Sequence, residues 1–99
     1  MSLITNPLHP GEVLAELYLD PLGMSAGSLA KALHLPRTRI ERIVKGETGI
    51  SPDTAHRLAR YFRTTPQMWL GMQANYDAAH CRPPESELSA IEPRPLEGA

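Results

Sequence analysis

The sequence predicts an all-α protein, because start and stop signals divide most of the chain into five short helices. Its 99 residues are enough for one small domain with its own core. Between clusters of proline, glycine and capping residues, apolar residues recur three and four positions apart, which is the period of an amphipathic helix. We therefore expect a five-helix domain over residues 8–80. Residues 81–99, where prolines and glutamates replace large apolar side chains, are expected to form a disordered or extended tail.

The first expected helix begins at Pro10, since proline suits the first helical position. Leu14, Leu17 and Tyr18 have the spacing of residues that share one helix face. The pair Asp20–Pro21 is expected to end this helix, because a proline and the residue before it both disfavour its continuation.

The second and third expected helices are separated by the tight turn His34–Leu35–Pro36. Ser25 is a good N-cap for the second helix, which Pro36 interrupts. The inward face of this helix comprises Leu29, Ala30 and Leu33. The third helix covers about residues 37–45 and stops at Gly46, since glycine most readily takes the left-handed conformation after a helix. Two short helices joined in this way are typical of a helix-turn-helix motif.

The fourth and fifth expected helices both open on a capping residue followed by proline, at Ser51–Pro52 and Thr65–Pro66. Gly49 is expected to keep the preceding loop flexible. The inward face of the fourth helix comprises Ala55, Leu58, Ala59 and Phe62. One side of the fifth comprises Met68, Trp69, Met72, Tyr76 and Ala79, and the other comprises Leu70, Ala74 and Ala78. A helix that is apolar on two sides is enclosed in a core or shared with a second subunit, so we expect the second side to form a homodimer interface.

The third helix has one apolar side and one basic side. Ile40, Ile43 and Val44 cluster on the first when residues are placed at steps of about 100°. A basic side opposite a buried one suits the major groove of DNA, where the first turn of a recognition helix reaches base edges. We expect base contacts from Arg37, Thr38, Arg39 and Arg42. We expect phosphate contacts from Lys45, Ser25 and Ser28. The alternative interpretation is an ordinary surface helix rich in arginine.

Charge is unevenly distributed along the chain, although the formal net charge is only −1. Residues 31–63 carry eight basic and three acidic side chains, whereas the segment after Cys81 is acidic. Residues 1–30 contain three acids and no lysine or arginine. These three acids, which we expect to contact a basic protein partner, are Glu12, Glu16 and Asp20. Alternatively, they only solvate the first helix and favour its dipole.

Several classes of function find no support in the sequence. The single Cys81 cannot form an internal disulfide, which fits a reducing cytoplasm. The histidines lack metal-ligand spacing and are expected at the surface or in turns, so we expect neither a metal nor a cofactor. They are His9, His34, His56 and His80. No apolar run reaches the roughly 20 residues of a membrane span, Met1–Thr5 does not open a signal peptide, and no nucleophile motif indicates an enzyme.

Five motifs follow one another over about residues 8–80. They are His9-Pro10-Gly11-Glu12-Val13-Leu14, Leu19-x-Pro21-Leu22-Gly23-Met24-Ser25, Pro36-Arg37-x-Arg39-Ile40, the segment from Gly49 to Phe62, and Thr65-Pro66-x-Met68-Trp69-Leu70. In this order they resemble the HigA-type antitoxins, which belong to the lambda-repressor-like (XRE) helix-turn-helix group. The chain departs from that pattern at Ala26, where many relatives have Gln, at Lys45, where Asn is frequent, and in the tail after Cys81.

The resemblance implies a homodimeric repressor that binds an operator at its own promoter and neutralises a small HigB-type ribonuclease toxin by direct contact. Because helix-turn-helix dimers read two half-sites, the operator is expected to be an inverted repeat in double-stranded DNA. Two alternatives remain open. One is a solitary helix-turn-helix transcriptional regulator without a toxin partner, and the other is a protein-interaction module whose DNA affinity has decayed. A neighbouring gene for a small basic protein would favour the antitoxin.

Overall fold

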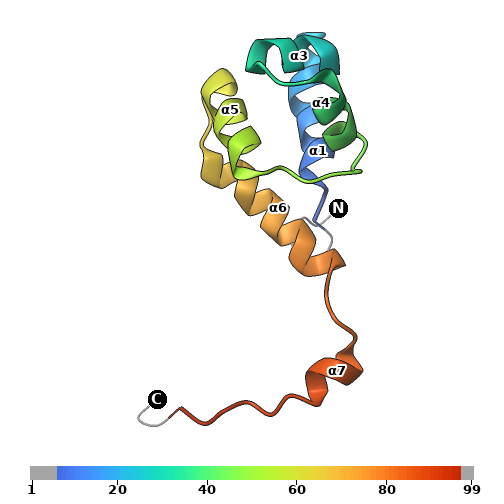
Figure 1. Cartoon of the computed structure of the whole chain (residues 1–99), viewed down its shortest axis with the longest axis vertical. Helices are drawn as coiled ribbons and strands as arrows, with labels where there is room; N and C mark the ends of the chain where they lie inside the picture. The colour runs from blue at the N-terminus through green and yellow to red at the C-terminus, as the bar shows by residue number, and fades with distance from the viewer. Residues whose placement is uncertain (1–6, 97–99) are drawn as a thin grey trace.

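The computed structural model describes residues 7–96, and within that range its regular elements are all helices, which confirms the all-α prediction. In chain order they are α1 (Pro10–Val13), η1 (Leu14–Leu19), α2 (Asp20–Leu22), α3 (Ala26–Leu33), α4 (Arg37–Val44), α5 (Pro52–Phe62), α6 (Pro66–His80) and α7 (Glu85–Ser89). Figure 1 shows α1, α3, α4 and α5 gathered at one end of the molecule, with α6 leading away from them towards the tail. The expectation for Met1–Thr5, and the part of the tail expectation that covers residues 97–99, lie outside the described residues.

The first helix differs from the prediction, because α1, η1 and α2 continue as one N-terminal helical segment through Asp20–Pro21. Pro21 is the second residue of α2, and because it has no N–H it donates no backbone hydrogen bond to the turn before it. η1 is a π-helix, in which backbone N–H groups reach five residues back rather than four. This wider turn moves the buried face from the predicted Leu17, which is 67% exposed, to Leu19, which is 4% exposed. The segment ends instead at Gly23, whose φ of 63° is left-handed.

One hydrophobic core joins the helices. Trp69 of α6 is fully buried, and its indole N–H donates to Thr64 Oγ1 at 2.8 Å. Tyr18 packs against Phe62 beside it, with ring centroids 4.7 Å apart. The buried aliphatic residues of this core are Leu14, Leu19, Leu29, Ala30, Leu33, Ile40, Ile43, Ile50, Ala55, Leu58 and Ala59. The inward faces predicted for the second and fourth helices are therefore confirmed.

The helix boundaries predicted from capping residues are also confirmed. Ser25, Ser51 and Thr65 each accept a hydrogen bond from the backbone N–H three residues further on. Gly49 has a packing role in the loop before α5. Gln73 of α6 accepts a hydrogen bond from the N–H that follows this glycine, that of Ile50, at 2.8 Å. A Cβ at Gly49 would lie 2.9 Å from the Gln73 amide, so the missing side chain lets the loop tie to α6.

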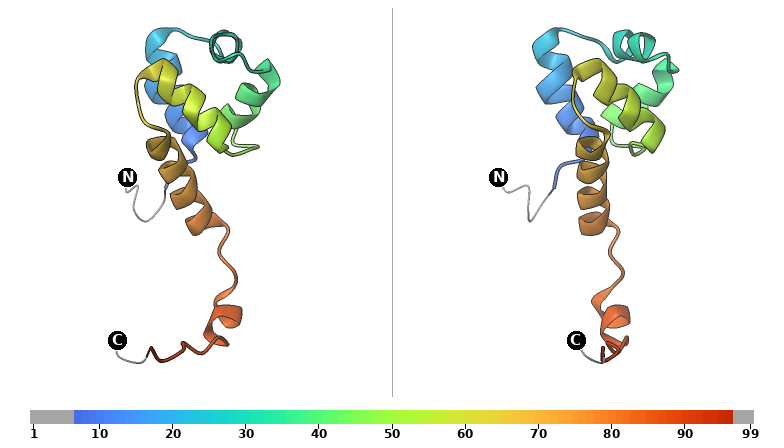
Figure 2. Two further views of the ribbon diagram at one scale, coloured as in Figure 1. Left: turned by 60° about the vertical axis from the view of Figure 1, so that its left-hand side comes forward. Right: turned by 90° about the vertical axis from the view of Figure 1, so that its left-hand side faces the viewer.

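α6 extends beyond the bundle in all the views of Figures 1 and 2. Ala79 is exposed for this reason, although it lies on the predicted side of the helix that includes the buried Trp69. On the second apolar side, Ala74 and Ala78 are exposed while Leu70 packs partly against the core. After α6 the chain runs away from the bundle as an extended tail, as predicted, except that it contains the five-residue helix α7.

The start of α1 is fixed against the end of α4. His9 caps α1 through Nδ1, which accepts from the Gly11 N–H at 2.9 Å, and its ring packs edge-on against Tyr76 at 4.9 Å between centroids. His9 is therefore a buried capping residue and not the surface or turn residue predicted. A Cβ at Gly11 would overlap the Ile43 carbonyl oxygen, so only glycine lets α1 approach α4 this closely.

Two kinds of feature are not found in residues 7–96. None of the helices there combines the length and apolar character needed to cross a bilayer. No three His, Cys, Asp or Glu side chains in this range gather as metal ligands.

Candidate nucleic-acid interface

α4 begins directly after Pro36 and presents two opposite faces. Ile40 and Ile43 are buried against the core, as predicted. The residues predicted to reach base edges are exposed on the other side, and they are Arg37, Thr38, Arg39 and Arg42. Lys45 is exposed at the end of the same helix. The residues predicted to contact bases, and one residue predicted to contact a phosphate, therefore lie on the exposed side of one helix.

Each arginine of α4 lies within ion-pair distance of an acid. The pairs are Arg37 Nε with Glu41 Oε2 at 3.4 Å, Arg39 Nη1 with Asp53 Oδ2 at 3.4 Å, and Arg42 Nε with Glu47 Oε1 at 3.9 Å. Exposed pairs of this kind contribute only about 0–1 kcal/mol to stability. The guanidinium groups of Arg37 and Arg42, whose acids each pair with one arginine, can therefore exchange a carboxylate for a phosphate or a base edge at little cost.

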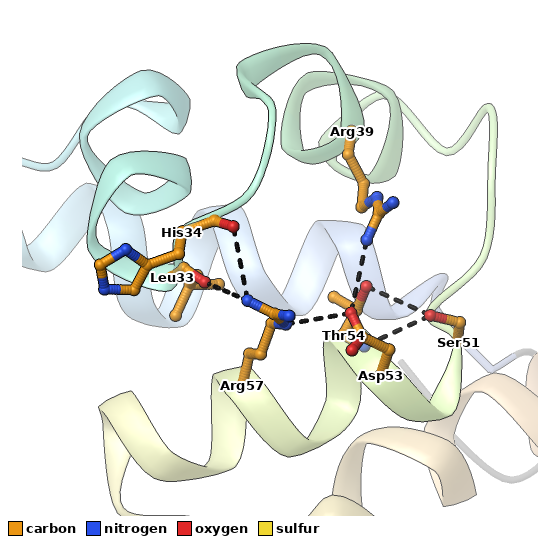
Figure 3. A network of polar contacts seen from close by, with 7 residues as sticks. All are labelled: Leu33, His34, Arg39, Ser51, Asp53, Thr54 and Arg57. Carbon is orange, nitrogen blue, oxygen red and sulfur yellow. Dashed lines mark hydrogen bonds and ion pairs between the residues drawn. The ribbon is translucent and has the colours of Figure 1, made fainter.

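Asp53 and Arg57, one turn apart on α5, connect the two helices of the motif (Figure 3). Asp53 Oδ2 accepts a hydrogen bond from Arg57 Nε at 3.0 Å and one from Arg39 Nη1 at 3.4 Å. Arg57 Nη1 donates to the Leu33 carbonyl oxygen at 2.8 Å and to that of His34 at 3.4 Å, where α3 ends on a left-handed residue. The sequence alone placed neither Asp53 nor Arg57 at the interface, although their i, i+4 spacing with opposite charge is a detectable signal.

The predicted phosphate contacts Ser25 and Ser28 lie at the exposed start of α3. Ser25 Oγ accepts from the Ser28 N–H at 3.0 Å, so this hydroxyl already caps the helix. Arg37 lies over the same turn, because a Cβ at Gly27 would be 3.1 Å from Arg37 Cδ. An anion at this turn would therefore meet the positive end of the α3 dipole and a guanidinium together.

The predicted partner contacts lie on other elements. Glu12, Glu16 and Asp20 are exposed along the N-terminal helical segment. Leu17 and Leu22 are exposed on the same segment, at 67% and 59%. This segment therefore presents both acidic and apolar side chains to solvent, whereas the predicted dimer residues are on α6.

A helix-turn-helix family model matches residues 14–69, which include α3, α4 and α5 completely. The chain is also 48% identical over 86 residues to Virulence-associated protein I of Dichelobacter nodosus, an alignment that spans 87% of this chain and 80% of the relative. The chain belongs to the helix-turn-helix family. In the geometry of this family's motif, α4 takes the place of the recognition helix.

Solved structures of helix-turn-helix antitoxins are similar to almost the whole chain. An addiction module antidote protein of the HigA family from Coxiella burnetii is 41% identical with a TM-score of 0.79, covering 92% of this chain and 99% of the other. The Pseudomonas aeruginosa antitoxin HigA with the higBA promoter is 36% identical with a TM-score of 0.81, again covering 92% and 99%. The predicted resemblance to HigA-type antitoxins and the lambda-repressor-like fold are thereby confirmed.

Proposed function

We propose that this chain is the antitoxin of a toxin–antitoxin module, which represses its own promoter by binding operator DNA through α4 and neutralises a HigB-type ribonuclease toxin by direct contact. It acts by binding rather than by catalysis, in the cytoplasm. The observation that carries the DNA-binding part is the exposed basic side of α4 opposite the buried Ile40 and Ile43. The similar structure of Pseudomonas aeruginosa HigA with the higBA promoter supports the same mode of binding.

The exposed residues of α4 divide between bases and phosphates. Arg37, Thr38 and Arg39 occupy its first turn, the part of a recognition helix that approaches base edges. A guanidinium can bind guanine O6 and N7 as a fork, and a threonine methyl can touch a thymine methyl. Arg42 follows one turn later. Lys45 and the start of α3 at Ser25 and Ser28 bind phosphates, which set the register on the duplex.

The test is a fluorescence-anisotropy titration of the full chain against the DNA upstream of its own gene and against a scrambled duplex. We expect specific binding whose logarithm falls linearly with the logarithm of salt concentration. Arg39→Ala or Arg42→Ala should cost about 1–3 kcal/mol on the cognate site, whereas Lys45→Ala should weaken both duplexes alike. Absence of binding to the upstream DNA at low salt would reject the proposal.

We further propose that the active form is a homodimer built on the outer side of α6. Ala74 and Ala78 are exposed there, and Leu70 is half-buried beside them. A two-fold dimer would read an inverted repeat with half-sites about 34 Å apart or a multiple of it. Ala74→Glu and Leu70→Glu should both shift light scattering towards a monomer. Ala74 is exposed, so Ala74→Glu should leave the monomer folded, whereas Leu70→Glu should also disturb the core against which Leu70 packs. A wild-type monomer at high micromolar concentration contradicts this proposal.

The toxin contact is proposed for Glu12, Glu16 and Asp20 on the N-terminal helical segment. A ribonuclease must itself be basic to hold RNA phosphates, so an exposed acidic segment would speed its capture. The exposed Leu17 on the same segment supplies apolar area for a lasting contact. Glu12 lines one pocket with Lys45 at the end of α4, whereas neither Glu16 nor Asp20 lines it, so we place the main toxin contact at Glu16 and Asp20, where repression and neutralisation can coexist. Co-purification with the product of the neighbouring gene would separate an antitoxin from a solitary regulator.

A further inference from the structure

We infer that Asp53 is a positioning residue for DNA reading, which holds Arg39 where its guanidinium meets a base edge and so raises sequence selectivity. The inference rests on the proposed DNA-binding function. It extends that function to α5, a helix outside the helix-turn-helix motif that carries none of the proposed DNA contacts.

The geometry makes Asp53 a fixed point between two guanidinium groups (Figure 3). Its Oδ2 lies 3.0 Å from Arg57 Nε and 3.4 Å from Arg39 Nη1. Arg57 is itself anchored, because its Nη1 donates to the Leu33 carbonyl oxygen at 2.8 Å. Asp53 also lies in the first turn of α5, which Ser51 caps. The end of α3, the start of α5 and Arg39 are thus linked through a single carboxylate oxygen.

This anchoring distinguishes Arg39 from the other arginines of α4. Glu41 and Glu47, the acids paired with Arg37 and Arg42, have no second arginine partner among residues 7–96. An acid held by only one long side chain can move with it, so it orders that side chain little. Asp53, in contrast, is held on α5 by Arg57 and can restrict the rotamers of Arg39 before DNA arrives.

Two physical effects of Asp53 then act in opposite directions. Immobilising a rotamer-rich side chain on binding costs free energy, and an arginine that is already ordered avoids part of that cost at the cognate site. The negative charge of Asp53 near the duplex opposes binding to any sequence, because it repels phosphates. Asp53 should therefore strengthen binding where Arg39 finds its base and weaken binding elsewhere.

The experiment compares Asp53→Asn with the matched control Glu47→Gln, by anisotropy of the full chain on the upstream duplex and a scrambled duplex. Both variants remove one acid from the surroundings of α4, but only the first releases Arg39. Asp53→Asn should weaken binding to the upstream duplex about three- to tenfold. It should tighten binding to the scrambled duplex about twofold. Glu47→Gln should tighten both by the same factor.

A second measurement places Asp53→Asn in an Arg39→Ala background. There the loss on the upstream duplex should disappear, and thermal melting of every variant reports whether the fold is kept. The inference is overturned if the loss of affinity persists without Arg39, or if Asp53→Asn changes the affinities for both duplexes by the same factor. It is also overturned if both affinities fall together with the melting temperature. If the wild-type chain does not bind the upstream duplex, the proposed function is rejected as well. Wild-type binding with unchanged selectivity in Asp53→Asn rejects the inference alone.

Discussion

α4 and the N-terminal helical segment pack against each other, yet only α4 buries the face that its residue spacing predicts. α4 is a regular α-helix between Pro36 and a left-handed Gly46, and Ile40 and Ile43 are buried as expected. The N-terminal segment contains the π-helix η1, which buries Leu19 in place of the expected Leu17. Spacing therefore predicts a helix face only where every turn has the regular geometry.

The size of the shift follows from helix geometry. In a regular α-helix, a residue five positions further on lies about 140° around the axis, on another face. A π-helical turn takes up one more residue, which returns Leu19 to the side of Leu14. Substitutions in the two helices and at the contact between them should therefore differ in their effects on stability and binding.

The register of the N-terminal segment should have the largest effect on stability. Leu19→Ala should lower the free energy of unfolding by about 2–5 kcal/mol, because it removes a fully packed side chain. Leu17→Ala, the matched deletion at an exposed site, should change it by less than about 0.5 kcal/mol. Urea denaturation followed by circular dichroism measures both values. A larger effect of Leu17→Ala than of Leu19→Ala would instead support the regular α-helix that the spacing predicts.

The contact between the two helices should be the next most sensitive site. Gly11→Ala should destabilise the fold by about 1–3 kcal/mol or more, since the new Cβ overlaps the Ile43 carbonyl oxygen. Gly71→Ala is the control, because a Cβ at this position of α6 meets nothing within 4 Å. It should stabilise the fold by about 0.5–1 kcal/mol through the loss of backbone freedom in the unfolded chain. Calorimetric melting of the two variants separates the overlap of a new Cβ from the change in backbone freedom of the unfolded chain. An unchanged stability in Gly11→Ala would contradict the close approach of α1 to α4.

The opposite charges of the two helices should show in binding kinetics. The double variant Glu12→Lys, Glu16→Lys should slow association with a basic toxin about three- to tenfold at low salt and make it less salt-sensitive. The base contacts of α4 are untouched, so the ratio of affinities for the upstream and scrambled duplexes should not change. Glu85→Lys with Glu87→Lys makes the same charge change on α7 and serves as the control. Unaltered kinetics in the first variant would assign the acids to solvation alone and would shift interest to the tail.

The pH dependence of stability should be the smallest effect. Burial lowers the pKa of the His9 imidazole below its ordinary value of 6.5, although a backbone hydrogen bond at Thr48 and the Asp77 and Glu12 carboxylates oppose the shift. The folded state therefore favours neutral His9, and its contribution is complete above about pH 6.5 and is lost as the pH falls towards the lower folded value. His9→Asn keeps a capping side chain that does not titrate. Its melting temperature should fall less than that of wild type between pH 7 and 5, and equal slopes would contradict this role of His9.

Local chemistry in the sequence determined most of the secondary structure and the exposed side of the proposed interface. Ser25, Ser51 and Thr65 begin helices because a capping hydroxyl acts within three residues. The exposed side of α4, including Arg39 and Arg42, follows from an uninterrupted period of 3.6 residues. These signals act over one or two helical turns, so they can be recognised without knowledge of the fold.

The tertiary structure alone decided the features that join residues far apart in the chain. The link from Arg57 through Asp53 to Arg39 spans three helices. Local spacing indicates only the pairing of Asp53 with Arg57 within α5, and not the contact with Arg39. Gly11 is required only because α1 meets the Ile43 carbonyl of α4. The π-turn likewise buries Leu19 in a core whose other members come from other helices. Packing and hydrogen bonds between distant segments depend on where the backbone brings them, and residue type and spacing along the chain do not contain that information.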